Sequence, residues 1–331
     1  MRSIILSALL LGFAASLSYA MVLDGRPVQP VTTYSIVARD PDNGQLGVAV
    51  QSHWFSVGPV VPWVQAGVGA VATQSLTEIS YGPLGLELMR GGKTATQALS
   101  GLLRIDENPQ WRQVGMIDAA GNRGVHTGRK CIREAGHVSG ENFICMANLM
   151  ERNTVWQAMA DAFRSTKGDL ADRMLAALEA AQAEGGDIRG RQSAAMIIVS
   201  GEPTGVPYKD KIFDLRIEDH PNPVKELRRL VAISRAYKFM NDGDERLAEN
   251  DAAGALKAYS RAMQLAPQIT EIQFWSALTL FTNGREEEAL ENFKQVFAKE
   301  KKWIEVVRRL PYADLLKNDA GQLDKILNAA E

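Results

Sequence analysis

The sequence is poor in histidine and cysteine, and its charges almost cancel. It has four histidines and two cysteines in 331 residues, with a formal net charge of −2. The histidines show no metal-ligand spacing, so we predict neither a metal site nor a cofactor. Residues of both signs are mixed along the chain, which argues against the basic surface of a nucleic-acid-binding protein.

Long apolar runs are absent after residue 20. The first twenty residues, "MRSIILSALLLGFAASLSYA", combine Arg2, an apolar stretch and small residues at Ser18 and Ala20. That pattern is typical of a cleaved signal peptide, and the stretch is too short for a membrane span. We therefore expect a periplasmic or secreted protein without a membrane span. Residues 21–32 would form a pro-segment or an extended arm.

The two cysteines, Cys131 and Cys145, lie in a stretch that is typical of paired strands. In an oxidising compartment they could form a disulfide. Two buried free thiols fit equally well, because neither the spacing nor the neighbouring residues fix the distance between them. The sequence leaves both alternatives open.

Residues 33–222 read as blocks of strands separated by helices. The strand segments alternate apolar and polar residues or are wholly apolar, and turns with Gly, Asn or Pro separate them. Such blocks, rather than alternating strands and helices, predict an α+β domain of antiparallel sheets with helices packed outside. The expected helices are one over about 84–102, broken or divided at Gly91-Gly92, and a long one from about Thr154 to Glu184 with Asn153 as its N-cap.

Residues 223–331 read as helical throughout, beginning with Pro223 in the first turn of a helix. Ala255 and Ala289 lie 34 residues apart, and an aromatic residue follows each by one helical turn, Tyr259 and Phe293. This period resembles that of tetratricopeptide repeats, which implies an all-α helical-repeat region that docks a protein partner. Two generic amphipathic helices are the alternative, and a homo-oligomer stays open.

Familiar catalytic motifs are missing: there is no G-x-S-x-G, no P-loop and no H-E-x-x-H. What remains is a pair of threonines, Thr32 and Thr33, directly before the first strand. A threonine at the start of a strand suits an N-terminal nucleophile (Ntn) hydrolase, because its own α-amine, with a pKa of about 7.7 to 8.0, can act as base for its hydroxyl. Thr33 is therefore the candidate nucleophile.

Several blocks resemble one family. "TYSIVARDP", "GQLGVAVQSHWFSVGPVVPWVQAGVGAVATQS", "YGPLGLELM", "GRQSAAMIIV" and "DLRIEDHPNPVKELRRL" resemble the domain of unknown function 1028 family over roughly residues 33–235. The resemblance implies a fold similar to the Ntn-hydrolase αββα sandwich, with Thr33 where relatives begin Met-Thr. Signal cleavage after Ala20 would leave residues 21–32 ahead of Thr33, so a free α-amine needs a second cut.

The strand order suggests which residues could assist Thr33. Ser52 and His53 end the second strand, which returns beside Thr33 in a hairpin, and Gln74 ends the third strand, where an amide could serve an oxyanion hole. Asn148 could do the same or could bond only to backbone. We further predict substrate-binding roles for four charged residues, although Arg39 could instead form a turn-side ion pair with Asp40, and the other three could form a solvated loop: Arg39, Asp187, Arg189 and Arg191.

These observations predict an exported hydrolase that acts on an amide or peptide-like bond. The first lysine of the chain is Lys93, so the positive charge near Thr33 has to come from Arg39, His53 or a later segment. The alternative is a non-catalytic binding or scaffold protein that works through its helical repeat. Peptides, acyl-amino acids and cell-wall amides are all open as substrates.

Overall fold

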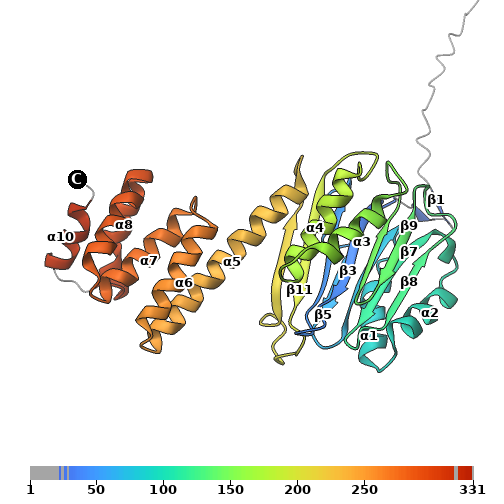
Figure 1. Ribbon diagram of the computed structural model, residues 1–331, viewed down its shortest axis with the longest axis horizontal. Coiled ribbons are helices and arrows are strands. Elements are labelled where there is room, and N and C mark those ends of the chain that lie inside the picture. Colours follow the sequence, from blue (N-terminus) through green and yellow to red (C-terminus); the bar gives the residue numbers. More distant parts are fainter. Residues whose placement is uncertain (1–21, 24–25, 28–29, 317–319, 330–331) are drawn as a thin grey trace, which may run out of the picture.

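A computed structural model of the chain describes residues 22–23, 26–27, 30–316 and 320–329. The predicted signal peptide, residues 1–20, lies outside these residues. Of the predicted pro-segment, β1 (Val22–Leu23) and β2 (Arg26–Pro27) form a small antiparallel pair, and Val31 pairs with Ser75 of the first domain. Figure 1 shows a layered domain of sheets and helices at one end of the molecule and helices alone at the other.

Two antiparallel sheets form the middle of the layered domain. The larger sheet has the order β12-β11-β4-β3-β10-β9, and the smaller one has the order β5-β6-β7-β8. The strands of the larger sheet are β3 (Thr33–Arg39), β4 (Leu46–Ser52), β9 (Gly136–Gly140), β10 (Phe143–Ala147), β11 (Ser193–Val199) and β12 (Lys211–Ile217). Those of the smaller sheet are β5 (Pro62–Gln65), β6 (Gly69–Ser75), β7 (Arg112–Asp118) and β8 (Arg123–Thr127).

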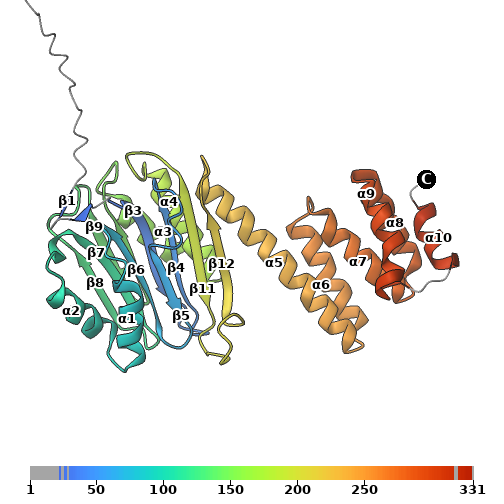
Figure 2. The same ribbon diagram turned by 180° about the vertical axis from the view of Figure 1, so that it is seen from behind.

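Helices cover the outer face of each sheet, as Figure 2 shows. The pair α1 (Tyr81–Arg90) and α2 (Ala95–Ile105) packs on the smaller sheet, and α3 (Val155–Ser165) and α4 (Leu170–Ala183) pack on the larger one. Because strand residues point alternately to the two faces, Tyr34 and Ile36 of β3 face the helices, while Val37 lies in the core between the sheets. The prediction of an α+β domain with antiparallel sheets is confirmed.

The long helix predicted from Thr154 to Glu184 is wrong, because the segment forms two helices, α3 and α4. Gly168 interrupts the helical path with a φ of +129°, a value that side-chain-bearing residues rarely adopt. The side chain of Asp169 then caps α4 by accepting a hydrogen bond from the Asp172 N–H at 3.0 Å. Thr154, rather than Asn153, occupies the N-cap of α3. The predicted break at Gly91-Gly92 between α1 and α2 is confirmed.

Both cysteines are free and buried, so the alternative of two separate thiols holds. Cys145 lies on β10 and belongs to the core beneath α3 and α4. Cys131 follows β8, and its sulfur lies 3.4 Å from the backbone oxygen of Arg112. Burial raises the pKa of both thiols, which keeps them in the neutral form.

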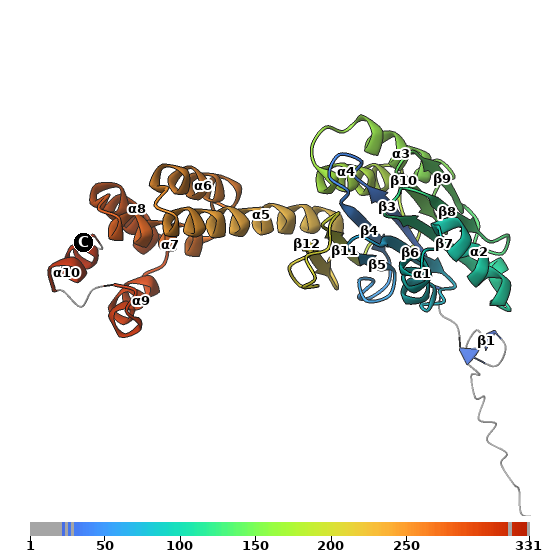
Figure 3. The same cartoon turned by 90° about the horizontal axis from the view of Figure 1, so that it is seen from below.

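The helical region begins with α5 (Pro223–Ala248), which spans the distance between the layered domain and the remaining helices (Figure 3). Val224, Leu227 and Val231 at its start belong to the core beneath α4, whereas Ala236 packs in a cluster with residues of α6 and α7. A predicted domain boundary at residues 222–223 thus coincides with the start of a helix that serves both cores. None of the helices described here is long and apolar enough to cross a membrane.

The remaining helices follow α5 in pairs and short segments. They are α6 (Ala252–Leu265), α7 (Thr270–Thr282), α8 (Glu286–Lys299), α9 (Lys302–Arg309) and α10 (Ala320–Asn328). Two 3₁₀ turns complete the described elements, Pro109–Trp111 before β7 and Leu310–Ala313 after α9.

Candidate functional site

Thr33 is the first residue of β3 and is fully buried between the two sheets. It pairs with Ser52 at the end of β4, as a hairpin of these two strands predicts. The Thr33 hydroxyl donates to the Val31 carbonyl oxygen at 2.9 Å, and its Oγ1 lies 3.2 Å from Ser52 Oγ. The structure therefore confirms that Thr33 and Ser52 lie side by side.

The carbonyl group of Thr32 is held by two donors. Ser52 Oγ donates to the Thr32 oxygen at 2.5 Å, and Arg189 Nη2 donates to it at 2.9 Å. A hydroxyl and a guanidinium on one carbonyl oxygen pull electron density from its carbon, as an oxyanion hole does. The carbonyl of the peptide bond between Thr32 and Thr33 thus accepts from one hydroxyl and one guanidinium.

Arg189 is oriented by Asp187. Two of its nitrogens bind the carboxylate, Nε to Oδ1 at 3.0 Å and Nη2 to Oδ2 at 2.7 Å, and the Asp187 side chain is fully buried. The backbone N–H of His53 also donates to Asp187 Oδ2 at 3.2 Å. A planar two-point pair of this kind fixes the guanidinium plane, so Arg189 presents one N–H to Thr32 in a defined direction.

Of three further predicted residues, Arg39 and Arg191 take other places, whereas His53 directly follows Ser52. Arg39 ends β3 at the far side from Thr33, where its Nε donates to the Ala119 carbonyl at 2.8 Å, so it lies apart from the other predicted site residues. A seven-residue strand separates its two ends by about 20 Å. Arg191 contacts Asn222 Oδ1 at 2.6 Å. The His53 ring nitrogen Nδ1 is buried without a hydrogen-bond partner among the described residues.

Backbone and side-chain amides hold the carbonyl group of Thr33. The backbone N–H of Asn148 donates to the Thr33 oxygen at 3.1 Å, and the side-chain Nε2 of Gln74 donates to it at 3.3 Å. Gln74 Nε2 and Asn148 Nδ2 both donate to Gln113 Oε1, at 2.7 and 2.9 Å. Gln74 and Asn148 therefore lie at Thr33, as predicted, and their side-chain N–H groups donate to the Thr33 carbonyl and to their common acceptor, Gln113 Oε1.

Gln113 joins this network without having been predicted. It is the register partner of Gln74 on β7 and is fully buried, and its Nε2 donates to the Ala147 carbonyl at 2.9 Å. The sequence does hold a signal, since "WRQVGMID" places a glutamine inside an otherwise apolar strand. A buried glutamine needs several partners, and a second buried glutamine on the neighbouring strand supplies one of them.

The surroundings of Thr33 also hold polar atoms without partners and strained backbone. Thr32 Oγ1, Ser75 Oγ and Asn148 Oδ1 are buried and make no hydrogen bond within the described part of the chain. Ser75 has a φ of +75° and Leu149, next to Asn148, a φ of +56°. Unpaired buried groups and left-handed backbone at non-glycine residues both cost free energy, and proteins concentrate them at functional sites.

Residue Val31 closes the site from the N-terminal side. Its N–H donates to the Ser75 oxygen at 2.8 Å, and its oxygen accepts from the Ser75 N–H at 3.0 Å. The segment before Thr33 therefore adds one antiparallel bridge at the end of β6. Thr33 has no exposed surface. The Thr33 hydroxyl is thus enclosed by the pairing of Val31 with Ser75 and by the two sheets.

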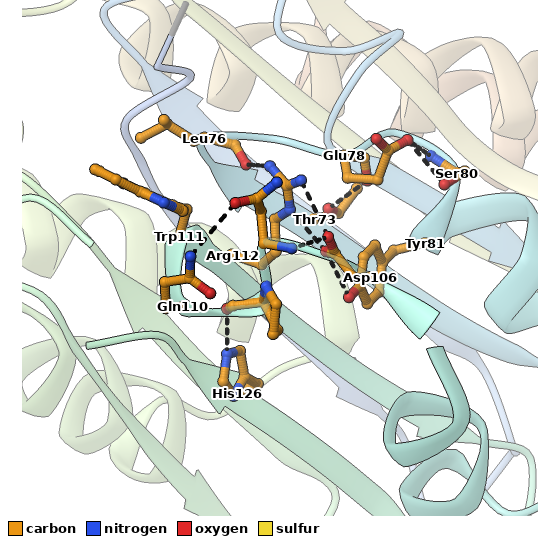
Figure 4. Close-up of polar contacts among 12 residues, drawn as sticks. Thr73, Leu76, Glu78, Ser80, Tyr81, Asp106, Gln110, Trp111, Arg112 and His126 are labelled. Atoms are coloured by element: carbon orange, nitrogen blue, oxygen red, sulfur yellow. Dashed lines mark hydrogen bonds and ion pairs between the residues drawn. The ribbon is translucent and has the colours of Figure 1, made fainter. Parts of the chain in front are cut away.

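A buried ion pair fixes the strand end on which Ser75 lies (Figure 4). Arg112, the register partner of Ser75, donates from Nη1 to the Leu76 carbonyl at 2.7 Å and from Nε to Asp106 Oδ2 at 2.8 Å. The Tyr81 hydroxyl donates to the same oxygen at 2.9 Å. Burial by itself would raise the pKa of Asp106, but hydrogen bonds from Arg112, the Asn108 N–H and Tyr81 outweigh it and lower that pKa.

Metal chemistry has no visible support at this site. The described residues contain no group of three or more His, Cys, Asp or Glu side chains that could hold a metal ion. The groups around Thr33 are hydroxyls, amides and one guanidinium, which bind and polarise carbonyl groups. The arrangement is thus suited to acyl chemistry at an amide.

One family model and two solved structures match part of the chain. The chain resembles the crystal structure of protein SPO2555 from Silicibacter pomeroyi, which carries the DUF1028 family model, with 30% identity and a TM-score of 0.53 over 60% of this chain and 87% of that one. Anbu (ancestral beta-subunit) from Yersinia bercovieri aligns with 14% identity and a TM-score of 0.30 over 60% of this chain and 92% of its own. No curated protein gives a significant match. The model of the family of unknown function DUF1028 matches residues 33–227, from Thr33 to the second turn of α5, and the chain belongs to this family.

Proposed function

We propose that this protein is an Ntn-type hydrolase that acts on an amide or peptide-like bond with Thr33 as its nucleophile. The observation that carries the proposal is the Thr32 carbonyl, which Ser52 and Arg189 polarise directly beside the Thr33 hydroxyl. In the intact chain the Thr33 nitrogen belongs to a peptide bond and cannot act as a base. The proposal therefore includes a cut between Thr32 and Thr33.

The cut uses the same groups as the later reaction. The Thr33 hydroxyl adds to the Thr32 carbonyl carbon, and the C–N bond breaks as the nitrogen takes the proton that the hydroxyl gives up. Thr32 is then joined to Thr33 Oγ1 by an ester, which water hydrolyses. The products are a carboxylate at Thr32 and a free hydroxyl and α-amine at Thr33.

After the cut, a substrate carbonyl takes the place of the Thr32 carbonyl. Ser52 and Arg189 donate to its oxygen as negative charge develops there, and the α-amine of Thr33 accepts the hydroxyl proton. The amide network of Gln74 and Asn148 keeps the Thr33 backbone in place through its carbonyl oxygen. Arg189 thereby supplies the positive charge that the sequence left unassigned.

The layered domain supports an Ntn-type αββα arrangement, because two facing antiparallel sheets lie between two helix pairs. We include in the proposal that α5 to α8 are two tetratricopeptide-like units. Ala255 and Ala289 are buried, and Tyr259 and Phe293 are buried one turn later in each unit. A Cβ at Gly243 would lie 2.5 Å from the Tyr259 ring, so α5 and α6 pack too closely there for a larger residue. Export by the predicted signal peptide belongs to the same proposal.

The test is the intact mass of the protein purified after export, followed by hydrolysis assays on a panel of peptides and N-acyl amino acids. We expect a chain that begins at Thr33. Thr33→Ala should keep the fold, stay uncut and lose turnover by at least about a thousandfold, whereas Thr33→Ser should keep part of both reactions. Thr32→Ala is the matched control, because it leaves the Thr32 carbonyl and its donors in place. A mature, folded chain that keeps residues 21–32 would contradict the proposal.

A binding protein is the second candidate, and the full burial of Thr33 beneath Val31 favours it. Its partner would dock on the helical region, where a pocket of about 420 Å³ lies between α6 and α8. Leu256, Met263 and Leu280 give this pocket an apolar floor, and Glu287 and Glu291 give it an acidic rim. The intact mass separates the two candidates, since an uncut chain leaves only the binding function.

A further inference from the structure

The two residues before Thr33 lie inside the layered domain rather than on its surface. Thr32 has no exposed surface and Val31 is 4% exposed, whereas Pro30 is half-buried. The proposed cut separates Thr32 from Thr33 and so releases these residues. The uncut chain therefore holds in place the kind of acyl group that a substrate would bring to the Thr33 hydroxyl.

The backbone of Val31 is bound at both of its polar atoms. Its N–H donates to the Ser75 oxygen at 2.8 Å, and its oxygen accepts from the Ser75 N–H at 3.0 Å, as in an antiparallel bridge. The Val31 oxygen also accepts from the Thr33 hydroxyl at 2.9 Å, so this residue contacts the proposed nucleophile. An amino-acid residue supplies both an N–H and a carbonyl in this place. A simple acyl group could make at most one of the two hydrogen bonds with Ser75.

The side chain of Val31 packs in the apolar core between the sheets. It belongs to the same buried cluster as Val50, Val57 and Met146. A charged side chain among these residues would lose most of its hydration, which is costly in free energy. The place of Val31 therefore favours an apolar residue.

The place of Thr32 is defined by its carbonyl group and by an unpaired hydroxyl. Its oxygen accepts from Ser52 and Arg189, whereas its Oγ1 is buried without a hydrogen-bond partner in the described part of the chain. A buried hydroxyl without a partner costs free energy. Valine has the shape of threonine with a methyl group instead of the hydroxyl. This place should therefore accept valine more readily than the threonine that the chain itself carries.

We propose that the substrate is an extended peptide whose two residues before the cleaved bond take the places of Val31 and Thr32. The inference rests on the proposed function, because the cut has to free these places. The first residue bonds to Ser75 through its N–H and its carbonyl and puts an apolar side chain between the sheets. The second presents its carbonyl to Ser52 and Arg189. Its bond to the following nitrogen is hydrolysed with one water, which gives a peptide acid and an amine.

The test uses the exported protein after its intact mass has shown that it begins at Thr33. The probe is N-acetyl-prolyl-valyl-valine para-nitroanilide, which releases para-nitroaniline on hydrolysis. In its ester analogue, oxygen replaces the N–H of the first valine and removes the donor to Ser75. We expect a kcat/KM at least about fivefold lower for this analogue and for N-acetylvaline para-nitroanilide, which lacks the first residue. Equal values for the probe and the ester analogue would overturn the proposal.

Two further analogues test the side chains. Aspartate in place of the first valine should lower kcat/KM by at least about thirtyfold, because a carboxylate would enter the core between the sheets. Threonine in place of the second valine should lower it by about two- to tenfold, because its hydroxyl is buried without a partner. Hydrolysis of the aspartate analogue at the rate of the probe would contradict the place assigned to the first residue.

The cut itself provides a second measurement, since it uses the same two places. Val31→Asp should slow the cut by at least about thirtyfold. Val31→Ile keeps the N–H, the carbonyl and an apolar side chain, so it is the matched control and should be cut at about the parental rate. Both variants leave the same mature chain, so any difference arises before the cut. A folded Val31→Asp chain that is cut as fast as the parent would overturn the proposal.

The substrate assignment and the proposed function fail in different ways. A chain that stays uncut contradicts the hydrolase and the substrate assignment together. A chain that is cut and then hydrolyses N-acetylvaline para-nitroanilide as fast as the probe keeps Thr33 as nucleophile and overturns only the peptide substrate. A chain that is cut but hydrolyses none of these compounds also overturns the peptide substrate.

Discussion

The interior beside Thr33 and the interior of the helical region bury polar side chains in different ways. In the described helical region the fully buried polar side chain is Ser276, which bonds to the Ile272 carbonyl one turn earlier on the same helix. In the layered domain Gln74 bonds to Gln113, and Arg189 reaches Thr32 across 157 positions. The first arrangement forms whenever the helix forms. The second exists only once several strands and the loop before β11 have assembled.

The difference shows where the fold gives up stability. A buried polar group that bonds within its own helix costs little, whereas one that depends on distant partners is expensive when any partner is missing. The layered domain nevertheless collects such groups at one end of its sheets and keeps the middle of its inter-sheet core apolar, with Val37, Val48 and Ile144. That concentration makes the Thr33 end of the sheets more costly to bury than their apolar middle.

The largest effect should come from the cation at this end. Arg189→Lys keeps a charge beside Asp187 but loses the planar two-point pair and the direction of the N–H toward Thr32. We expect the cut between Thr32 and Thr33 to slow by about a hundredfold or more. Pulse labelling followed by intact-mass analysis measures this rate.

Arg216→Lys serves as the control for that experiment. Arg216 pairs with Asp214 on β12, where the Arg216 side chain is 36% exposed, and it makes no contact with Thr32. If Arg189→Lys folded and were cut at the parental rate, Arg189 would have no role in the cut. The buried contacts of Arg189 would then be no more functional than those in the helical region.

A smaller effect is expected for Gln74→Leu. The change leaves Ser35 without its acceptor at 2.7 Å and removes one of the two donors to Gln113 Oε1, while the volume stays similar. We expect a loss of roughly 1 to 3 kcal/mol in the free energy of unfolding, measured with denaturant. Gln157→Leu, on the exposed side of α3, should change it by less than about 0.5 kcal/mol. If both substitutions lowered the free energy of unfolding equally, breaking the buried network would cost no more than removing an exposed glutamine.

The helical region is tested by Ala255→Trp. Ala255 is 1% exposed, so a large ring has to displace its neighbours and should destabilise the region by roughly 1 to 3 kcal/mol. Ala253→Trp on the exposed side of α6 is the matched control. Hydrogen exchange locates the effect, and we expect faster exchange in α5 to α7 but not in β3 or β4. Exchange that rises equally in both regions would show a single cooperative unit.

The smallest expected effect is on the stability of the fold at low pH. The pKa of Asp106 is lowered below its ordinary value of 3.8, so its ion pair with Arg112 stabilises the fold above that value and the contribution disappears as the pH falls through the lower one. Melting temperatures of the parent should therefore drop more steeply below about pH 4 than those of Asp106→Asn. Asp161→Asn, an exposed pair partner on α3, should follow the parent.

Local patterns predicted the parts of the site that depend on local structure. The hairpin of β3 and β4 places Ser52 opposite Thr33, and the end of β6 brings Gln74 to the same point, because strand alternation and turns are visible in the sequence. Arg189 was recognised only as one of several charged candidates, since a loop of five residues can point each of them elsewhere. Arg39 lies at the opposite end of β3 from Thr33, as the length of the strand predicts.

Long-range pairing explains what the sequence could not reveal. Gln113 matters because β7 lies beside β6 in one register, and no local pattern fixes that register. The ion pair of Arg112 and Asp106 joins a strand start to the end of α2 and depends on the same assembly. The division of residues 154–184 into α3 and α4 rests on Gly168 and the Asp169 cap, which a helical period spanning both helices conceals.

The continuous helix α5 sets a length scale for whatever the two regions do together. Its 26 residues extend over about 39 Å, with one end packed under the larger sheet and the other among α6 and α7. A flexible linker would let a captured molecule sample many distances from Thr33. A continuous helix instead holds the two regions at a fixed distance. Only a ligand long enough to span this distance could contact both regions at once.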